Sequence, residues 1–282
     1  MKNTVTTLFL CLFGLSHIQL KAQDRVFART YQSNVLAKGN FDIEFWSTLR
    51  SGKTGENTNY LLGRRMDQRL ELEFGLGKNV QTAFYLNYSK GIYISTINDT
   101  SALTELKQNT SISNEWKFKL SDPVANVIGT ALYFELEAGP DEYEIESKII
   151  LDKKIDKHLF ACNIISEVEF ESEIELENGR LKKEMEIETP LELTAGYMYF
   201  LKPWLGIGAE VRNYNGISKE DGWEYSALFG GPTLFFSQGR LFGTLNLAPQ
   251  FSNLHRTDHE DGKLVLNDLE KSECRLIIGY SF

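Results

Sequence analysis

The sequence predicts an all-β fold, a transmembrane antiparallel up-and-down β-barrel of about 12 strands, and three observations lead to that prediction. Apolar and charged residues alternate along most segments, so each strand has one apolar face and one charged face. Short turns and longer polar stretches join these segments in turn. The chain ends on RLIIGYSF, in which Leu276, Ile278, Tyr280 and Phe282 share one face.

The first residues have the three parts of a secretory signal peptide. Lys2 precedes an apolar run from Val5 to Leu15, and Ala22 supplies the small residue before the expected cleavage site. The apolar run is too short to span a bilayer comfortably. The chain therefore divides into a signal peptide (1–22), an N-terminal periplasmic or lumenal segment (23–39) and an outer-membrane β-barrel (40–282).

The charge, the hydropathy and the cysteines of the chain argue against three features: a nucleic-acid partner, a transmembrane helix and a disulfide. The chain has 39 acidic and 30 basic residues, a net charge of −9, which argues against nucleic acid as a partner. No stretch after the signal peptide is apolar for long enough to form a transmembrane helix. Cys162 and Cys274 are expected near opposite membrane surfaces, so we predict no disulfide between them.

The strands of the amino-terminal half follow from the alternation. Five strands are predicted over 41–46, 66–74, 80–88, 115–120 and 128–137. They are separated by SGKTGENTN, GLGKN, a long polar stretch over 95–111 and SDP, and AGPDE ends the fifth. Charges on one face and apolar groups on the other do not suit the core of a secreted β-sandwich, which shares the alternation. They suit a barrel with a wet interior.

The next three strands contain a check on register. A sixth strand over 143–151 ends at DKKID, and a long hairpin turns at Asn178-Gly179, the dipeptide preferred by two-residue turns. Setting Glu177 opposite Arg180 pairs Leu176 with Leu181, Phe170 with Ile187, and Ile164 with Leu193. Each of the two strands of this hairpin would have about twenty residues, twice what a tilted transmembrane strand needs. We therefore expect the tip near Asn178 to project beyond the membrane and to be accessible to protease.

The last four strands are predicted over 205–212, 225–236, 241–247 and 275–282, with polar loops over 213–222 and 253–268. Pro232 removes a ladder donor and is expected to mark a bulge. Every second connection is short, which is typical of periplasmic turns, and the longer ones are expected outside. Aromatic residues near strand ends are expected in interfacial girdles: Tyr60, Trp116, Tyr143, Tyr199, Trp204, Trp223, Tyr225, Tyr280 and Phe282.

The final strand and several segments also carry a resemblance. A closing strand that ends on Phe282 resembles the terminal signal by which the insertion machinery recognises outer-membrane barrels. The stretches FARTYQSNVLAKGNFDIEFWSTLR, RLELEFGLGKNVQTAFYLNYS, NEWKFKLSDP and ALYFELE resemble Bacteroidetes-type outer-membrane β-barrels of the family assigned to the MetA pathway of phenol degradation. The resemblance implies a barrel in the bacterial outer membrane, in contact with its lipid. No residue identifies an aromatic substrate.

Catalysis and metal binding have weak support in the sequence. His158 lies beside a periplasmic turn with no serine close in sequence, so we interpret it as an interfacial polar residue. His255 and His259 lie in HRTDHEDG, a mixture that could hold a divalent ion but lacks the helical spacing of a zinc site. A solvated outer loop is the preferred interpretation. We predict no catalytic residue, no metal, no cofactor and no enzymatic activity.

The charged inner face supplies the candidate lumen residues. Opposite charges are interleaved there, which favours a structural ion-pair network over a selectivity filter. Twelve strands fall between a filled barrel and an open channel, so any pore is narrow or gated. The residues expected to line the lumen and to set selectivity are Arg69, Glu71, Lys117, Glu135, Glu144, Glu146, Lys148, Glu167, Glu210 and Arg212.

Together these features predict a narrow passive channel for small molecules whose substrate is not specified. An excess of glutamate over 167–177 favours cations, although the solvated face of a hairpin explains it equally well. Two alternatives stay open. One is an outer-membrane hydrolase acting on lipid, and the other is a non-conducting barrel that binds a surface partner through acidic outer loops.

Overall fold

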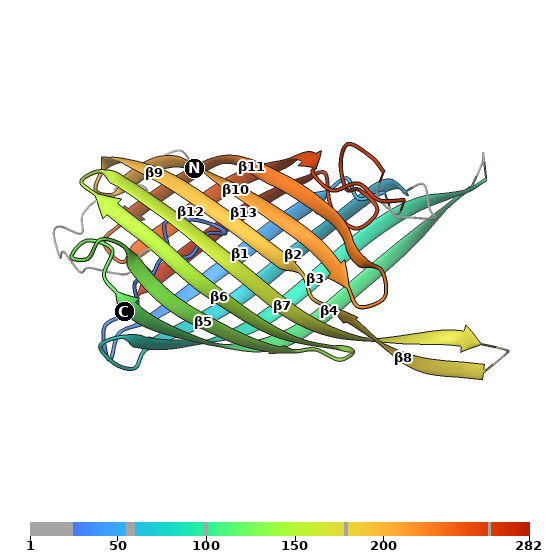
Figure 1. Cartoon of the computed structure of the whole chain (residues 1–282), viewed down its shortest axis with the longest axis horizontal. Helices are drawn as coiled ribbons and strands as arrows, with labels where there is room; N and C mark the ends of the chain where they lie inside the picture. Colours follow the sequence, from blue (N-terminus) through green and yellow to red (C-terminus); the bar gives the residue numbers. More distant parts are fainter. Residues whose placement is uncertain (1–24, 55–59, 99–100, 178–179, 259–260) are drawn as a thin grey trace, which may run out of the picture.

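A computed structural model of the chain describes residues 25–54, 60–98, 101–177, 180–258 and 261–282. The predicted signal peptide lies outside these residues. The structure is all-β, and its strands form one antiparallel sheet that closes on itself (Figure 1). Among the described residues no helix has the length and apolar character needed to cross a membrane.

The strands follow one another around the barrel in chain order. They are β1 (Phe41–Ser51), β2 (Tyr60–Gly75), β3 (Val80–Asn98), β4 (Ser101–Ser121), β5 (Gly129–Ala138), β6 (Glu142–Ile155), β7 (His158–Glu177), β8 (Arg180–Glu188), β9 (Leu191–Lys202), β10 (Leu205–Ser218), β11 (Gly222–Gln238), β12 (Leu241–Asn253) and β13 (Ser272–Ser281). Both β8 and β9 pair with β7, so together they occupy one position in the wall. Because β1 also pairs with β13, the barrel is closed with twelve strand positions, as predicted.

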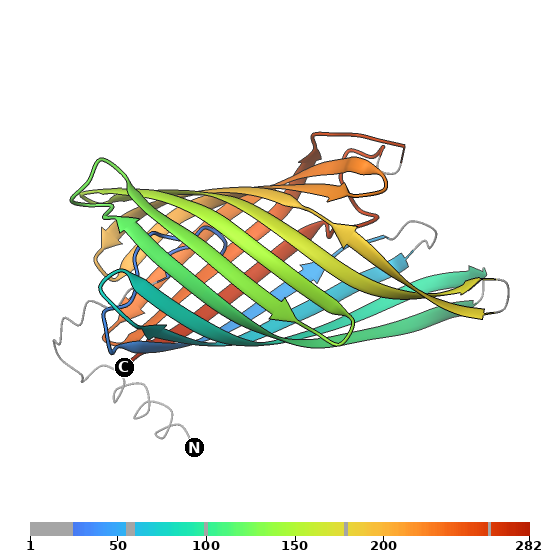
Figure 2. The same cartoon turned by 60° about the horizontal axis from the view of Figure 1, so that its bottom comes forward.

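The hairpin of β7 and β8 confirms the predicted register. Glu177 lies opposite Arg180 and Phe170 opposite Ile187, and the same register continues into β9, where Ile164 lies opposite Leu193. The turn at residues 178–179, and with it the predicted protease-accessible tip, lies outside the described residues. The hairpin projects well beyond the barrel, and the β3–β4 hairpin projects from the same end (Figures 1 and 2).

Alternation puts apolar side chains outside and polar ones inside. On β3, Phe84 is 54% exposed and its neighbour Tyr85 only 3%. On β5, Leu136 is 60% exposed and the adjacent Glu135 only 5%. An exposed apolar belt around a closed sheet leaves no strand edge unpaired and is stable only against lipid. The chain is therefore an outer-membrane barrel, as the sequence predicts.

Two of the predicted outer loops are wrong. Residues 95–111 do not form a loop, because β3 continues to Asn98 and β4 begins at Ser101. Likewise β10 continues to Ser218, so only 219–221 separate it from β11. These segments are polar because they lie beyond the membrane, yet their threonine, serine and isoleucine residues are compatible with strand pairing. Polarity therefore indicated exposure to water and not the end of the strand.

The two ends of the barrel differ in how their strands are connected. One end carries the connections 76–79, 122–128, 156–157, 203–204 and 239–240, together with the carboxyl terminus (Figure 1). We assign it to the periplasm, as for other outer-membrane barrels. The other end carries the projecting hairpins and the long segment 254–271, and it faces outside.

Other local predictions have mixed outcomes. Cys162 and Cys274 are free, as predicted. Tyr225 does not belong to an aromatic girdle: it is 7% exposed and packs inside the barrel, because a register shift at Gly216 and Ile217 sets its face. The register shift between β11 and β12 lies at Leu228 and Phe229, close to Pro232 but not at it.

Candidate functional site

The periplasmic half of the lumen is filled by the N-terminal segment 25–39, which we call the plug. It has no helix or strand, and it enters the barrel from the periplasmic end (Figure 2). Phe27 and Leu36 are almost completely buried in it. Because a buried backbone without regular structure needs other hydrogen-bond partners, the inward side chains of the strands must supply them.

Glu210 on β10 is the strongest of these partners. Its carboxylate accepts the backbone N–H groups of Ala28, Arg29 and Thr30 at 2.9, 2.8 and 2.9 Å. The Thr233 hydroxyl donates a further hydrogen bond to it at 3.0 Å. The carboxylate is 3% exposed, so these are charge-assisted hydrogen bonds in a site without bulk water.

Two amide side chains extend the attachment of the plug along the wall. Asn163 on β7 accepts the Tyr31 N–H at 2.6 Å and donates to the Tyr31 carbonyl at 3.1 Å. Gln81 on β3 accepts the Leu36 N–H at 2.9 Å. The plug is thus fixed to β3, β7 and β10, which lie far apart around the barrel.

Apolar contacts complete the attachment. Phe27 packs with Met198, Phe235 and Phe242 in one buried cluster. Gly196 provides the space for it, since a Cβ atom there would lie 2.8 Å from the Phe27 ring. Burying a phenylalanine contributes roughly 2–3 kcal/mol.

The extracellular half of the lumen is an open cavity of about 1080 Å³, which we call the vestibule. Arg29 and Tyr31 of the plug lie at its inner end, and residues of the outer connections, including Lys53 and Asp268, lie at its mouth. Among the described residues that line it, fifteen are acidic and nine are basic. The vestibule is therefore negatively charged overall.

The acidic residues gather on one wall, formed by β5, β6 and β7. Glu135, Glu146 and Glu167 lie side by side in register across these strands. So do Glu137 and Glu144, with Glu169 beyond them. Like charges directly opposite one another destabilise a sheet. Among the described residues the basic partners of this wall are Lys148 on β6, 2.7 Å from Glu146, and Arg69 on β2, 3.4 Å from Glu135.

The opposite wall, given the strand order, carries an arginine cluster. Arg29 of the plug, Arg50 on β1 and Arg212 on β10 all form ion pairs with Glu273 on β13, at 2.6 Å for Arg50 and 3.0 Å for Arg212. Arg275 donates to the Ala28 carbonyl at 3.2 Å. Charge is thus uneven across the vestibule: carboxylates lie next to one another on one side, whereas on the other side each carboxylate is paired with guanidinium groups.

The structure places all ten predicted lumen residues on the inner face. Seven of them line the vestibule: Arg69, Glu135, Glu144, Glu146, Lys148, Glu167 and Arg212. The other three, Glu71, Lys117 and Glu210, lie deeper and are 0%, 2% and 3% exposed. The predicted ion-pair network is only partly formed. Some of the interleaved charges are paired, but the acidic wall has more carboxylates than cations.

Sequence reasoning missed the contribution of the plug. Arg25, Arg29 and Tyr31 belong to a segment without periodicity, so the alternation could not assign them a face. The sequence predicts only that this segment is periplasmic or lumenal. Glu273 and Arg50 alternate with outward-facing residues on their strands and are paired with each other across β1 and β13. This alternation would have been enough to place both in the lumen.

The histidines do not form a catalytic group among the described residues. The ring of His158 lies 2.9 Å from the Tyr197 hydroxyl, beside the periplasmic turn, where an interfacial residue was predicted. His255 stacks on Trp223, with ring centroids 4.0 Å apart. His259, the second histidine of HRTDHEDG, lies outside the described residues. The prediction that the protein is not an enzyme stays a prediction.

Comparison with known proteins adds a family and similar folds. Residues 19–282 match the model of a family described as a family of unknown function, DUF6662. This differs from the phenol-degradation family that parts of the sequence resemble, whereas the barrel implied by that resemblance is confirmed. No curated protein is significantly similar in sequence.

Several solved structures share the fold at low identity. An outer membrane channel from Pseudomonas putida F1 is 10% identical, with 89% of this chain and 97% of that chain covered and a TM-score of 0.56. The translocator domain of the autotransporter NalP from Neisseria meningitidis is 10% identical, with 89% and 91% covered and a TM-score of 0.57. The NanC porin is 8% identical, with 84% and 98% covered and a TM-score of 0.50. At such identities the likeness shows the outer-membrane barrel fold.

Proposed function

Because the chain belongs to DUF6662, a family of unknown function, we propose its activity from the site itself. The protein is a narrow passive channel for small molecules in the outer membrane, with a preference for cations, and the plug is its gate.

The observation that carries the proposal is the charge of the vestibule. A water-filled entrance of about 1080 Å³ with more carboxylates than cations concentrates positive ions and repels negative ones. The names of two similar structures, a channel and a porin, agree with passive conduction. That support concerns the fold, and the charge preference rests on this chain alone.

The plug makes the closed state dominant. Hydrogen bonds to charged groups contribute about 1.5–3 kcal/mol each, and Glu210 accepts three from consecutive N–H groups of the plug. Losing them would cost roughly 5 kcal/mol, and every 1.4 kcal/mol is a factor of about ten in an equilibrium. Openings should therefore be rare and brief in the intact protein.

A second candidate is favoured by the same attachment. If the plug never leaves, the barrel does not conduct, and the vestibule is a binding site for a soluble partner or ligand. The alternative of a lipid hydrolase has no comparable observation in its favour among the described residues.

Planar-bilayer recording of the purified mature protein tests the proposal. We expect infrequent steps of small conductance, and a reversal potential in a salt gradient that shows selectivity for cations. Steps selective for anions would contradict the assignment of the acidic wall. Complete silence, at protein amounts that give steps with a known porin, would favour the non-conducting barrel.

A further inference from the structure

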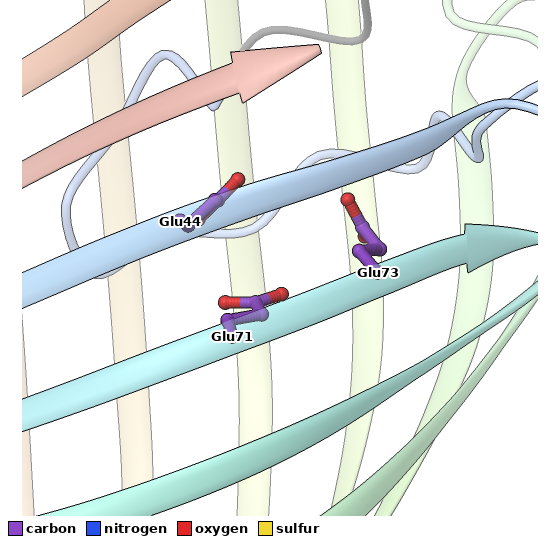
Figure 3. A group of neighbouring side chains, drawn as sticks. All are labelled: Glu44, Glu71 and Glu73. Carbon is purple, nitrogen blue, oxygen red and sulfur yellow. The ribbon is translucent and has the colours of Figure 1, made fainter. Parts of the chain in front are cut away.

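Below the vestibule lies a second, fully buried acidic cluster. It consists of Glu44 on β1 and of Glu71 and Glu73 on β2, which stand on neighbouring strands and on the same inner face (Figure 3). The three are at most 2% exposed, and none lines the vestibule cavity. One carboxylate oxygen from each lies within 4.8 Å of the other two.

The hydrogen-bond partners of this cluster are unevenly distributed. Glu44 accepts from the Trp46 indole at 2.9 Å and pairs with Arg25 of the plug at 3.1 Å. Glu73 accepts from the Gln81 amide. The carboxylate of Glu71 has no hydrogen bond, and only its Oε1 approaches a cation, with Arg25 Nη2 at 3.5 Å. Its Oε2 is buried and without a partner in the described part of the chain.

Charge around the cluster is also unbalanced. A further buried carboxylate, Glu115, lies on the same part of the inner wall. Among the described residues the bases near these four carboxylates are Arg25 and Lys117. Burying charge without compensation is costly, so this region needs further positive charge from protons or from a cation.

We propose that Glu44, Glu71 and Glu73 bind one divalent cation of the calcium class. Calcium–oxygen distances of about 2.3–2.6 Å allow two ligand oxygens to be as much as about 5 Å apart, and the three oxygens of the cluster all lie within 4.8 Å of one another. Magnesium, at about 2.0–2.1 Å, needs a smaller and more regular octahedral site. The free Oε2 of Glu71 gains a partner, and water completes the coordination.

The position of the site gives the ion a structural consequence. Glu44 and Glu71 are also the carboxylates that hold Arg25, so the ion and the plug share two ligands on the wall. The ion should therefore stabilise the barrel where the plug enters it. This inference does not depend on conduction, and it holds equally for a non-conducting barrel.

Terbium luminescence provides a site-specific test. Terbium replaces calcium at carboxylate sites and emits strongly when a nearby indole absorbs the light, and Trp46 is hydrogen-bonded to one of the proposed ligands. In the mature protein folded in detergent, we expect saturable emission with one ion per chain, displaced by calcium. The absence of saturable binding would overturn the proposal and leave protonation as the source of charge balance.

Variants assign the binding to the cluster. Glu71→Gln keeps the shape of the side chain and removes one charged ligand, so terbium affinity should fall at least about tenfold. The matched control is the triple variant E144Q/E146Q/E167Q, which neutralises the vestibule trio whose carboxylates are similarly close to one another. That variant should bind as the wild type does.

Two results would contradict the assignment: unchanged affinity in Glu71→Gln, or loss of binding only in the triple variant. Heat modifiability on a gel shows whether each variant is folded. If Glu71→Gln does not fold, Glu73→Gln replaces it with the same expected loss of affinity.

Discussion

The periplasmic and extracellular halves of the lumen are built from the same strands and the same alternation, yet they treat charge differently. In the periplasmic half, Glu210, Gln81 and Asn163 each bind the backbone of the plug and are buried. In the extracellular half, glutamates lie opposite glutamates around an open vestibule. The alternation of apolar and polar residues determines which side chains point into the lumen. Whether the plug or water fills the lumen determines how many unpaired charges the inner face tolerates.

Solvation explains the contrast. A carboxylate in a dry lumen must be hydrogen-bonded or paired, because its desolvation is not otherwise compensated. Carboxylates that border an open vestibule tolerate like-charged neighbours better, because water and salt in the cavity screen part of the repulsion. The buried trio of Glu44, Glu71 and Glu73 breaks this pattern, and for that reason it is the place where an ion is expected.

Deleting residues 25–38 should have the largest effect, because it removes the contents of the periplasmic half. We expect the open probability in planar bilayers to rise by at least about tenfold, since the closed state loses several kcal/mol of attachment. The barrel wall itself should persist, as its strands pair without the plug. Unchanged conductance in a folded deletion variant would show that the plug is not the gate.

Glu210→Gln should have the next largest effect, because it weakens the attachment without removing the plug. The amide keeps one acceptor oxygen but loses the charge, so the hydrogen bonds to Ala28, Arg29 and Thr30 become fewer and weaker. Openings should become roughly tenfold more frequent. Glu167→Gln is the matched control: it is also a lumen glutamate, and opening frequency should not change with it.

Neutralising the acidic wall should change selectivity and leave gating alone. In E144Q/E146Q/E167Q, introduced together with the plug deletion so that currents are easily measured, the reversal potential should shift toward anions by several millivolts or more. Glu220→Gln, on the exposed connection 219–221 outside the vestibule, should leave the reversal potential unchanged. If both variants behave alike, the wall does not set selectivity.

The smallest effect concerns a periplasmic turn. Hydrogen bonds from Lys119 and from the Ala125 and Val124 N–H groups lower the pKa of Asp122 from about 3.8 to about 2. A lowered pKa in the folded state contributes stability that is present above pH 4 and is lost as the pH falls toward 2. Asp122→Asn should therefore be slightly less stable than the wild type at pH 6, with the difference disappearing near pH 2.

Urea unfolding in lipid at the two pH values measures this difference. The side chain is largely exposed to water, so the effect should be small. An equal difference at pH 6 and at pH 2 would show that the charge of Asp122 does not stabilise the turn.

Much of the wall could be predicted from the sequence because strand periodicity is a local property. The register of β7 with β8 and β9 followed from one Asn-Gly dipeptide and continued past Pro190, where the strand is interrupted. The loops over 95–111 and 213–222 were wrong because polar residues outside the membrane can still pair as strands. The sequence predicted which charged residues face the lumen, but it did not predict which of them lie close together. That grouping depends on the register between strands around the whole barrel.

By itself, the sequence determined the all-β class, about twelve strands, the inward or outward direction of most described side chains in the wall and the location in the outer membrane. These properties follow from the period of two in a strand and from lipid on one side of it. Only the tertiary structure decided that residues 25–39 fill the periplasmic half of the lumen and that the carboxylates divide into a wall that lines the vestibule and a trio buried below it. An aperiodic segment carries no local signal for its partners, because those partners lie on strands distant in the chain.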